Sequence, residues 1–433
     1  MMRLTPRAPL VALALAAGLA GTLSAQTPTV SLEEAIRLSR QAQPSVVQAR
    51  GTARNADAQA RAAFGAYLPS LTASSTGSRS YTGTQRVGPT GELENATTTS
   101  VNFGLTASVD LFTGFRRGAD RRAARATQGA ADAGLTDTEF QAALTTTQQF
   151  FDALAAQQLV RVRETSVRRA EEQLNLSTAK LRVGSATRSD SLRSLVNLGN
   201  ARLALVSAES DVARTQAGLA RTLGLDGRVA AQDDSAFYVA AATVDTAALN
   251  REARDRSPRI IAATATAEAA DASVKAARSQ YYPTLGLNAS ANWSGNNQND
   301  YDLSPSRQLQ LGLSWPIFNR FQREQTLTTR LSALDVAEAN ARDARREVQA
   351  SLTSQYAALD AARVRIDISR ASVEAASEDL RVVNERYRVG AATILDILNS
   401  QEALAQAEVD AITARFDYLN AKAQIEALIG RRL

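Results

Sequence analysis

Apolar residues follow two different spacings along this chain, and segments with each spacing alternate twice. In the long segments they recur every seven residues, which is the spacing of α-helices that pack as coiled coils. In four shorter segments they occupy every second position, which predicts strands with one apolar and one polar face. The order of helix, two strands and helical hairpin therefore occurs twice. We predict an α+β fold, mainly α, built from two internal structural repeats.

The two halves of the chain also match in sequence. Residues 112–224 align without gaps on residues 318–430, at an offset of 206 positions. Each half contains a Gly turn between two helix-forming segments, which predicts hairpin tips at 183–187 and 389–393. The heptad positions that lead to the second tip are Leu352, Leu359, Ile366, Val373, Leu380 and Tyr387. This repeat predicts a long coiled-coil helix before each tip and a shorter helix after it.

The alternating segments predict strands at about residues 68–81, 99–112, 283–294 and 307–318. Their apolar faces would meet another sheet in a soluble sandwich, or lipid in an outer-membrane barrel, which about 9–11 residues can span. The opposite faces carry small neutral polar residues that suit a water-filled lumen, so the barrel is favoured. The links at 82–97 and 295–306 are rich in Gly, Asn and Thr and are expected to be external loops.

Four strands cannot close such a barrel alone, because the smallest common barrels have about eight. An open sheet edge in lipid would leave backbone N–H and C=O groups without partners. A barrel would therefore be shared between chains, and two or three copies would supply its strands.

Domain boundaries follow from the repeats and from the N-terminus. Arg3 and Arg7 precede an apolar run that ends at a small-residue cleavage site, which predicts a secretory signal peptide. Pro44 and Pro258 occupy matching places in the first helix of each repeat, where a bend is expected. The predicted units are a signal peptide at 1–25, repeat 1 at 26–225, a linker in an equatorial belt at 226–245, and repeat 2 at 246–433.

Composition excludes several classes of function. The chain has no Cys and no His, which excludes disulfides, thiol nucleophiles, His general bases and the usual zinc or copper ligands. No nucleotide-binding glycine motif or acid pair stands out, so we predict no enzymatic activity, no catalytic residue, no cofactor and no metal site. The formal charge of +5 falls to +3 without the signal peptide, which gives no reason to expect nucleic acid as a partner.

Several short motifs resemble those of the TolC-like outer-membrane efflux protein family, whose members are also called outer membrane factors. They are Ser31-Leu32-Glu33-Glu34-Ala35-Ile36, the strand starts Tyr67-Leu68-Pro69 and Tyr281-Tyr282-Pro283, the segment Trp315-Pro316-Ile317-Phe318, and the two Val-Gly tips. The resemblance covers essentially the whole mature chain. It implies a homotrimer whose twelve strands form one transmembrane β-barrel in outer-membrane lipid. A coiled-coil α-helical barrel would continue it across the periplasm.

The function that the resemblance implies is a passive exit duct in the cell outer membrane. Such a duct belongs to a tripartite efflux or type I secretion system and conducts substrates from an inner-membrane pump. Its partners would be a periplasmic adaptor protein and a pump of the RND or ABC type. The alternative from the heptads alone is a structural periplasmic coiled-coil spacer or adaptor protein without a pore. That alternative leaves the one-faced apolar strands unexplained.

The resemblance also implies a periplasmic gate at the tips. In the family a Tyr before the second tip bonds an Asp beyond the first, and here these places hold Tyr387 and Asp190. A further Arg of the family latch is replaced by Ala392, so Arg188 is the candidate substitute.

Two acidic rings can narrow the pore in the family, and adaptor hairpins contact the tip grooves. Asp396 matches the first ring, whereas Asn399 occupies the place of the second, so one charged ring is expected. The residues implicated in adaptor docking are Val183, Gly184, Val389 and Gly390.

Each of these residues also has a purely structural interpretation. Thr187 with Asp190, and Thr393 with Asp396, have the spacing of a capping box at a helix N-terminus. The tip glycines can serve only to allow a positive φ angle. Tyr387 lies on the heptad, where burial between helices is the alternative to a latch.

Overall fold

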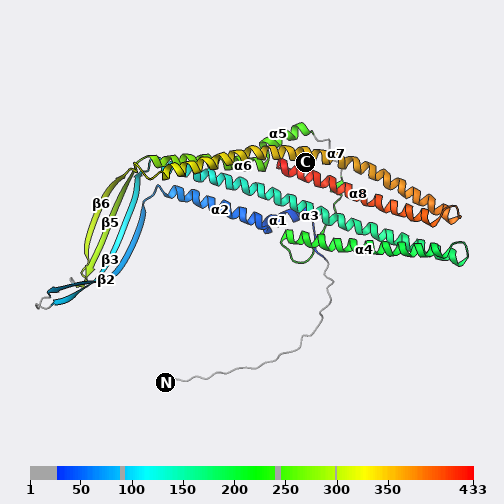
Figure 1. Ribbon diagram of the computed structural model, residues 1–433, viewed down its shortest axis with the longest axis horizontal. Coiled ribbons are helices and arrows are strands. Elements are labelled where there is room, and N and C mark those ends of the chain that lie inside the picture. The colour runs from blue at the N-terminus through cyan, green and yellow to red at the C-terminus, as the bar shows by residue number, and fades with distance from the viewer. Residues whose placement is uncertain (1–26, 88–92, 239–244, 298–299) are drawn as a thin grey trace, which may run out of the picture.

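The computed structural model shows an elongated molecule with a β-sheet at one end and two helical hairpin tips at the other (Figure 1). The structure describes residues 27–87, 93–238, 245–297 and 300–433. The predicted signal peptide at 1–25 lies outside the described residues. Each repeat contributes two strands to one end and one tip to the other.

The two repeats contain the same order of helices. The first has α1 (Leu32–Ala42), α2 (Pro44–Gly65), α3 (Arg116–Arg182) and α4 (Arg188–Leu223). The second has α5 (Thr246–Arg256), α6 (Pro258–Arg278), α7 (Gln322–Arg388) and α8 (Ile394–Ile429). Helices α3 and α7 have 67 residues each, and α4 and α8 have 36 each. At about 1.5 Å per residue, α3 and α7 are each about 100 Å long.

The first helix of each repeat is broken rather than bent at its proline. Gln43 is extended, with φ −65° and ψ 127°, and α2 starts at Pro44. A residue before proline is pushed out of the helical region, while proline itself is tolerated at the first helical position. Ser257 and Pro258 repeat the arrangement between α5 and α6. Each break lets two short helices follow one another along the longer helices.

Two sets of four helices lie side by side along the molecule. Toward the sheet the contacts give the order α2, α3, α6 and α7, and toward the tips the order is α4, α3, α8 and α7 (Figure 1). Of the six predicted heptad residues, Leu352, Leu359, Leu380 and Tyr387 are buried, and the other two are half-buried. The seven-residue spacing therefore marks the seams between helices, as expected.

The strands form one antiparallel sheet in the order β2, β3, β5, β6. Their bounds are β2 (Ser70–Val87), β3 (Leu93–Phe112), β5 (Thr284–Asn296) and β6 (Ser304–Ser314). The register keeps the two faces separate across all four strands. One row reads Leu71, Ala107, Ala289 and Leu309, and the next reads Ser70, Ser108, Asn288 and Gln310. In the described part of the chain, β2 and β6 pair with a strand on one side only.

The first strand pair extends beyond the predicted bounds, into the link at 82–97 that was expected to be a loop. Pairing continues to Val87 and Leu93, with a register shift between Thr82 and Gln85. The sequence pattern did not reveal this extension, because Gln85, Arg86 and their partners Asn95 and Glu94 continue no alternation of apolar and polar residues. At the other end of the sheet β6 stops at Ser314, earlier than predicted, because Pro316 cannot donate to a strand ladder.

The linker at 226–245 contains structure that the sequence pattern did not reveal. Strand β4 (Ala230–Ala231) pairs in parallel with β1 (Thr29–Val30), so the linker is tied to the start of the described chain. The following 3-10 helix (Ser235–Tyr238) brings Phe237 against Phe150 and Phe151, with ring centroids 6.1 and 5.5 Å apart. A buried apolar cluster forms around these rings, and we call it the equatorial cluster. Its largest members are Phe150, Phe151, Leu154, Leu219, Leu223 and Phe416.

Among the described residues, no helix is both long enough and apolar enough to span a membrane. The apolar side chains of the sheet are instead largely exposed in the single chain. They include Leu71, Leu309, Leu311 and Leu313, and Trp315 directly after β6 is exposed as well.

A glycine at the end of α4 gives a test of this packing. Gly224 has a φ of 71°, and a Cβ there would overlap the Cβ of Ala42 at the end of α1. Gly184 has a φ of 74° but faces open space. Either alanine loses about 1–2 kcal/mol to the left-handed conformation. Overpacking costs about 1–3 kcal/mol more, and only at Gly224.

We therefore expect Gly224→Ala to lower the unfolding temperature in detergent by clearly more than Gly184→Ala does. Circular dichroism melts of the two variants and the parent protein measure the difference. Equal shifts would show that α1 does not pack against the end of α4 as described.

Candidate functional site at the hairpin tips

Both tips turn at a glycine in the left-handed region. Gly184 has a φ of 74° and Gly390 a φ of 80°, conformations that side chains of L-residues rarely adopt. The turns are closed by matching backbone bonds, from Ser185 N to Lys180 O at 2.8 Å and from Ala391 N to Arg386 O at 2.7 Å. Val183 and Val389 are 78% and 81% exposed. Each tip therefore presents an apolar side chain to its surroundings on a rigid turn.

The two candidate gate carboxylates both cap a helix. Asp190 Oδ2 accepts hydrogen bonds from the backbone N of Thr187 at 2.9 Å and from its Oγ1 at 2.8 Å. Asp396 Oδ2 does the same with Thr393, at 2.8 Å from each atom. Both aspartates therefore form the capping box that their spacing from Thr187 and Thr393 predicts. Asp396 is exposed and Asp190 half-buried, so capping leaves Asp396 open to the tip surface.

The pKa of Asp396 lies below the ordinary value for an aspartate. The backbone N–H of Thr393 is the largest cause, followed by the Thr393 hydroxyl, and the nearby Arg386 charge acts in the same direction. All three favour the ionised carboxylate, so Asp396 carries a negative charge throughout the neutral range.

Tyr387 is buried at the second tip but does not bond Asp190 within the chain. Its hydroxyl has no hydrogen-bond partner among the described residues. Burial raises the pKa of this hydroxyl, the Asp190 carboxylate raises it further, and Gln173 lowers it. Asp190 therefore acts on Tyr387 through its charge, because its bonded oxygen is turned back to Thr187. Within the single chain Tyr387 and Asp190 are therefore not hydrogen-bonded, and Tyr387 lies at a buried heptad position.

Arg188 and Asn399 are both exposed near the tips. Among the described residues of the single chain, Arg188 makes no hydrogen bond or ion pair. Asn399 lies one helical turn beyond Asp396 on α8.

Sequence reasoning missed Lys180 at the end of α3. Its ammonium group donates hydrogen bonds to Tyr387 O and, at 3.4 Å, to Arg388 O, and it lies 4.1 Å from the Tyr387 ring centroid. These contacts join the first hairpin to the second. The only available signal was that Lys180 is one of three lysines in an otherwise arginine-rich chain.

Two more polar contacts join the hairpins farther from the tips. Arg169 on α3 forms a two-pronged ion pair with Glu408 on α8, at 3.2 and 2.8 Å. Asn197 on α4 donates to Gln401 on α8 at 3.3 Å. Polar contacts therefore join the hairpins at several levels, while at mid-height Phe416 of α8 packs against Phe151 of α3 in the equatorial cluster.

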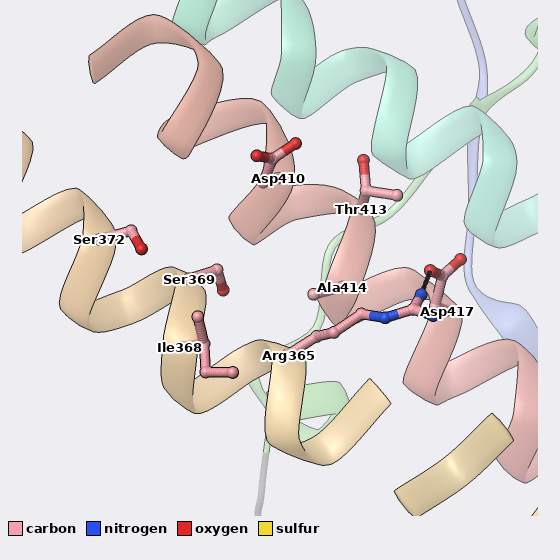
Figure 2. Close-up of a pocket in the computed structure, with 8 residues that line it drawn as sticks. All are labelled: Arg365, Ile368, Ser369, Ser372, Asp410, Thr413, Ala414 and Asp417. Carbon is pink, nitrogen blue, oxygen red and sulfur yellow. Dashed lines mark hydrogen bonds and ion pairs between the residues drawn. The ribbon is translucent and has the colours of Figure 1, made fainter. Parts of the chain in front are cut away.

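A groove of about 310 Å³ lies between α7 and α8, farther from the tips (Figure 2). Arg365 crosses it to Asp417, at 3.3 Å, while Ser369, Ser372 and Ala414 line it with small side chains. Within the described residues, no group of carboxylates suited to hold a metal ion occurs there or elsewhere.

Comparison with known proteins gives a consistent family and fold. The family described as "Outer membrane efflux protein" matches residues 35–225 and 249–431. A relative from Brucella suis, "Outer membrane efflux protein BepC", is 26% identical over 389 residues, which cover 87% of this chain and 82% of the relative.

Solved structures share the fold at low sequence identity. The outer membrane protein VceC of Vibrio cholerae superposes with a TM-score of 0.76 at 16% identity, covering 93% of this chain and 96% of its own. The Campylobacter jejuni CmeC outer membrane channel gives a TM-score of 0.80 at 17% identity, with 92% and 85% covered. The sheet, long helices and tips described above thus form an arrangement that these proteins also have.

The Arg169–Glu408 pair tests how the two hairpins are held together. Its side chains are only 19% and 22% exposed, compared with 61% and 42% for the surface pair Arg202–Glu171. Exposed pairs contribute about 0–1 kcal/mol, whereas loss of one partner from a more buried pair leaves an uncompensated charge.

In double-mutant cycles with Arg169→Met and Glu408→Gln, we expect each single change to destabilise the protein. The double variant should lose less than their sum. The same cycle with Arg202→Met and Glu171→Gln should be nearly additive. Denaturant unfolding in detergent gives both coupling energies, and additivity at the first pair would mean that it does not hold the seam.

Proposed function

The chain belongs to the outer membrane efflux protein family, and on that premise we propose that three copies build one continuous duct through the outer membrane and across the periplasm. A member of this family is an exit duct at the outer membrane. Family and fold are those of channel proteins rather than enzymes. The proposal concerns how this chain assembles, what it docks to and how its tip is gated.

The observation that carries the proposal is the four-stranded sheet with one apolar face. Its outer strands β2 and β6 each have one free edge among the described residues, and its apolar side chains are exposed. A hydrocarbon phase can cover the apolar face but cannot satisfy the free N–H and C=O groups of an edge. Both requirements are met when β6 of one copy pairs with β2 of the next and the sheet closes. Three copies give twelve strands.

The polar face supports a water-filled interior. Its rows of Ser, Thr, Asn and Gln continue across all four strands. Neighbouring side chains leave no room for a side chain at Gly104. A Cβ there would lie 2.8 Å from Ser74 Oγ and 2.9 Å from Asn292 Oδ1. Most of this face offers hydrogen bonds from neutral polar groups, and Asp110, in the row with Gly286 and Gly312, adds a carboxylate at its end.

The helices carry a second, independent indication of assembly. Helix α4 has exposed apolar residues at alternating spacings of four and three, which is a coiled-coil seam without a partner. They are Leu192, Val196, Gly199, Leu203 and Val206. Helix α7 has a similar exposed seam that includes Val364, Ile368, Ala371, Ala375 and Val382. The two helices lie at opposite edges of the four-helix layer (Figure 1).

The two seams match in height above the tips. Val206 lies 22 residues from Gly184, and Ile368 lies 22 residues from Gly390. Leu192 and Val382 each lie eight residues from their tip glycine. When α4 of one copy packs against α7 of the next, Leu192 meets Val382 and Val206 meets Ile368. Between them Val196 lies at the height of Glu378, so the seam is apolar at most but not all of its levels. The sheet and the helices thus favour the same neighbour arrangement.

The exposed tips are the proposed docking surface for a periplasmic adaptor. Val183 and Val389, each followed by a glycine turn, give a shallow apolar site that a helical hairpin of the adaptor would contact. The adaptor would connect the duct to an inner-membrane pump of the RND or ABC type, for efflux or type I secretion. A coiled-coil spacer without a pore is the alternative, but it would not need an exposed apolar sheet.

Asp396 is the proposed selectivity residue of the periplasmic gate. In a threefold assembly it would be repeated around the axis, and three ionised carboxylates at a constriction attract cations and repel anions. Asn399 adds no charge one turn away, so Asp396 would act nearly alone. Asp190, Tyr387 and Arg188 complete the proposed gate, with Arg188 free to contact a neighbouring copy.

The matching seams give a direct test of assembly, because the natural chain has no Cys. We expect the double variant Val206→Cys, Ile368→Cys to form disulfides between chains on mild oxidation, up to three chains and no more. Non-reducing electrophoresis and mass measurement in detergent give the number of copies. A detergent-free monomer without cross-links would remove the barrel and favour the spacer.

A matched control places the second cysteine at a different height on the same seam. Val382 lies 14 residues nearer the tip than Ile368, which is about 21 Å along a helix. The pair Val206→Cys, Val382→Cys should therefore not cross-link. Equal cross-linking of both pairs would indicate random collisions rather than the proposed packing.

Charge removal at the gate should change selectivity. We expect Asp396→Asn to lower the cation preference of the reconstituted channel and to weaken its block by multivalent cations, while the oligomer remains intact. The reversal potential of single channels across a salt gradient, with the tip side known, measures the preference.

Asp190→Asn is the matched control, because Asp190 forms the same capping box on the other hairpin. Asp190→Asn should disturb the start of its helix as much as Asp396→Asn does, but it should change the reversal potential less. It should raise the conductance if the Asp190 charge helps to hold the tip. An unchanged reversal potential for Asp396→Asn would mean that Asp396 is only a helix cap.

A further inference from the structure

The second hairpin is held together at its tip by apolar packing. Six residues of α7 and α8 form a buried cluster there, which we call the tip cluster. They are Leu380, Val383, Tyr387, Ile394, Ile397 and Leu404. Leu176 of α3 packs against its surface. A cluster of this kind keeps α7 and α8 together as one unit, because separating them would expose all of these side chains.

The first hairpin lacks an equivalent cluster. At an offset of 206, three of the six positions are polar, and these are Ser177, Arg188 and Ser191. A contact between hydroxyls, Thr178 Oγ1 to Ser191 Oγ at 3.3 Å, lies near this level instead. The two hairpins therefore differ in how they are held, although their lengths are the same.

Contacts between the hairpins at the tip are few and centre on Lys180. Its side chain leaves the last turn of α3 and reaches the C-terminal end of α7. There it donates to the carbonyl oxygens of Tyr387 and Arg388, above the Tyr387 ring.

Three physical effects favour this position of the ammonium group. The last carbonyls of a helix have no intrahelical partners, and here Tyr387 O accepts from Gly390 N of the turn at 3.2 Å, which leaves its second lone pair for an outside donor. The C-terminal end of α7 carries the negative end of the helix dipole, which attracts a cation. The Tyr387 ring adds a cation–π interaction at 4.1 Å, and Tyr387 is itself fixed in the tip cluster.

We propose that Lys180 is the clasp that holds the α7–α8 tip against the α3–α4 hairpin and so keeps the periplasmic end of the duct narrow. The proposal rests on the proposed function as a duct and names a positioning residue for its gate. Because the tip cluster makes α7–α8 one unit, opening the end requires that unit to move away from α3. The contacts of Lys180 are broken by that movement, whereas those of the tip cluster are kept.

The internal repeat supplies a control for this assignment. Arg386 is the residue that corresponds to Lys180 in the second repeat, at the offset of 206. Its guanidinium turns back to Ala391 O of its own tip, at 3.2 Å, and it is exposed. Corresponding positions in the two repeats thus hold two cations. Lys180 contacts the other hairpin, whereas Arg386 contacts only its own tip.

The test compares Lys180→Met, Lys180→Arg and Arg386→Met as single channels in planar bilayers. Lys180→Met keeps the length of the side chain but removes its charge and donors. It should shift the balance between narrow and wide tips toward the wide state by about fivefold or more, seen as higher conductance and more open time. Lys180→Arg should remain near the parent protein. Arg386→Met should leave the open time unchanged, because Arg386 bonds Ala391 O of its own tip, although its charge also acts on Asp396.

A chemical rescue separates the clasp from any effect on folding. Because the chain has no Cys, Lys180→Cys places a single thiol at the tip. Its thiolate displaces bromide from 2-bromoethylamine and forms a thioether that ends in an ammonium group, nearly the shape of lysine. Alkylation of the folded oligomer should restore the lower conductance, whereas iodoacetamide, which leaves a neutral amide, should not.

The outcomes distinguish the clasp from the duct. A folded Lys180→Met oligomer with the conductance of the parent, or equal effects of both alkylating reagents, would overturn the clasp. A parent protein that forms no channel at all would instead overturn the proposed function. Restoration by bromoethylamine alone supports the clasp.

Discussion

The unpaired edges of the sheet set the conditions that the rest of the molecule must meet. One face of the sheet is apolar and exposed, and both outer strands have free backbone groups on one side. A single chain has no way to satisfy these groups in lipid. In the proposed duct, closure of the sheet requires neighbouring copies, and it constrains the helices below, because each strand pair continues into α3 or α7. The exposed seams on α4 and α7 agree with that constraint, since they lie at opposite edges of one chain and at matching heights.

The internal repeat explains why the molecule reaches the same height at both tips. Helices α3 and α7 have equal lengths, as do α4 and α8, so the two tips end at one level. The two tips must lie at the same height to form a ring, but the side chains that hold each hairpin together need not be the same. The repeats have diverged where hairpins contact one another, with an apolar tip cluster in the second and hydroxyl contacts in the first. This divergence allows one hairpin to be a rigid unit and the seam beside it to be the weaker boundary.

The sequence predicted the elements whose signals are periodic. Heptads and the 206-residue offset predicted a long and a shorter helix around each tip, and the turns between α3 and α4 and between α7 and α8 lie at the predicted 183–187 and 389–393. The ends of strands were less accurate, since the pairing beyond Thr82 (Gln85 with Asn95, Arg86 with Glu94, Val87 with Leu93) has no apolar alternation to reveal it. The pairing of Thr29–Val30 with Ala230–Ala231 was invisible for the same reason, because two residues have no period. Lys180 was missed because its partners are backbone carbonyls, which every residue has.

The charged side chains of Lys180, Asp190 and Asp396 at the tips lie at the helix ends whose dipole has the opposite sign, both where they cap a helix and where we propose a gate. Each tip brings the C-terminal end of a long helix beside the N-terminal start of a shorter one, so opposite ends of helix dipoles meet there. Lys180 lies at the negative end of α7, and Asp396 at the positive start of α8. The hydrogen bonds from Thr393 lower the pKa of Asp396 in the folded protein. The ionised cap therefore stabilises the fold fully when the pH is above the ordinary pKa of an aspartate. This stabilisation is lost as the pH falls through the lowered pKa of the folded state. Those bonds reach Oδ2 alone, and among the described residues Oδ1 accepts none. The same carboxylate can therefore cap α8 and still face the pore of the proposed trimer with its charge intact.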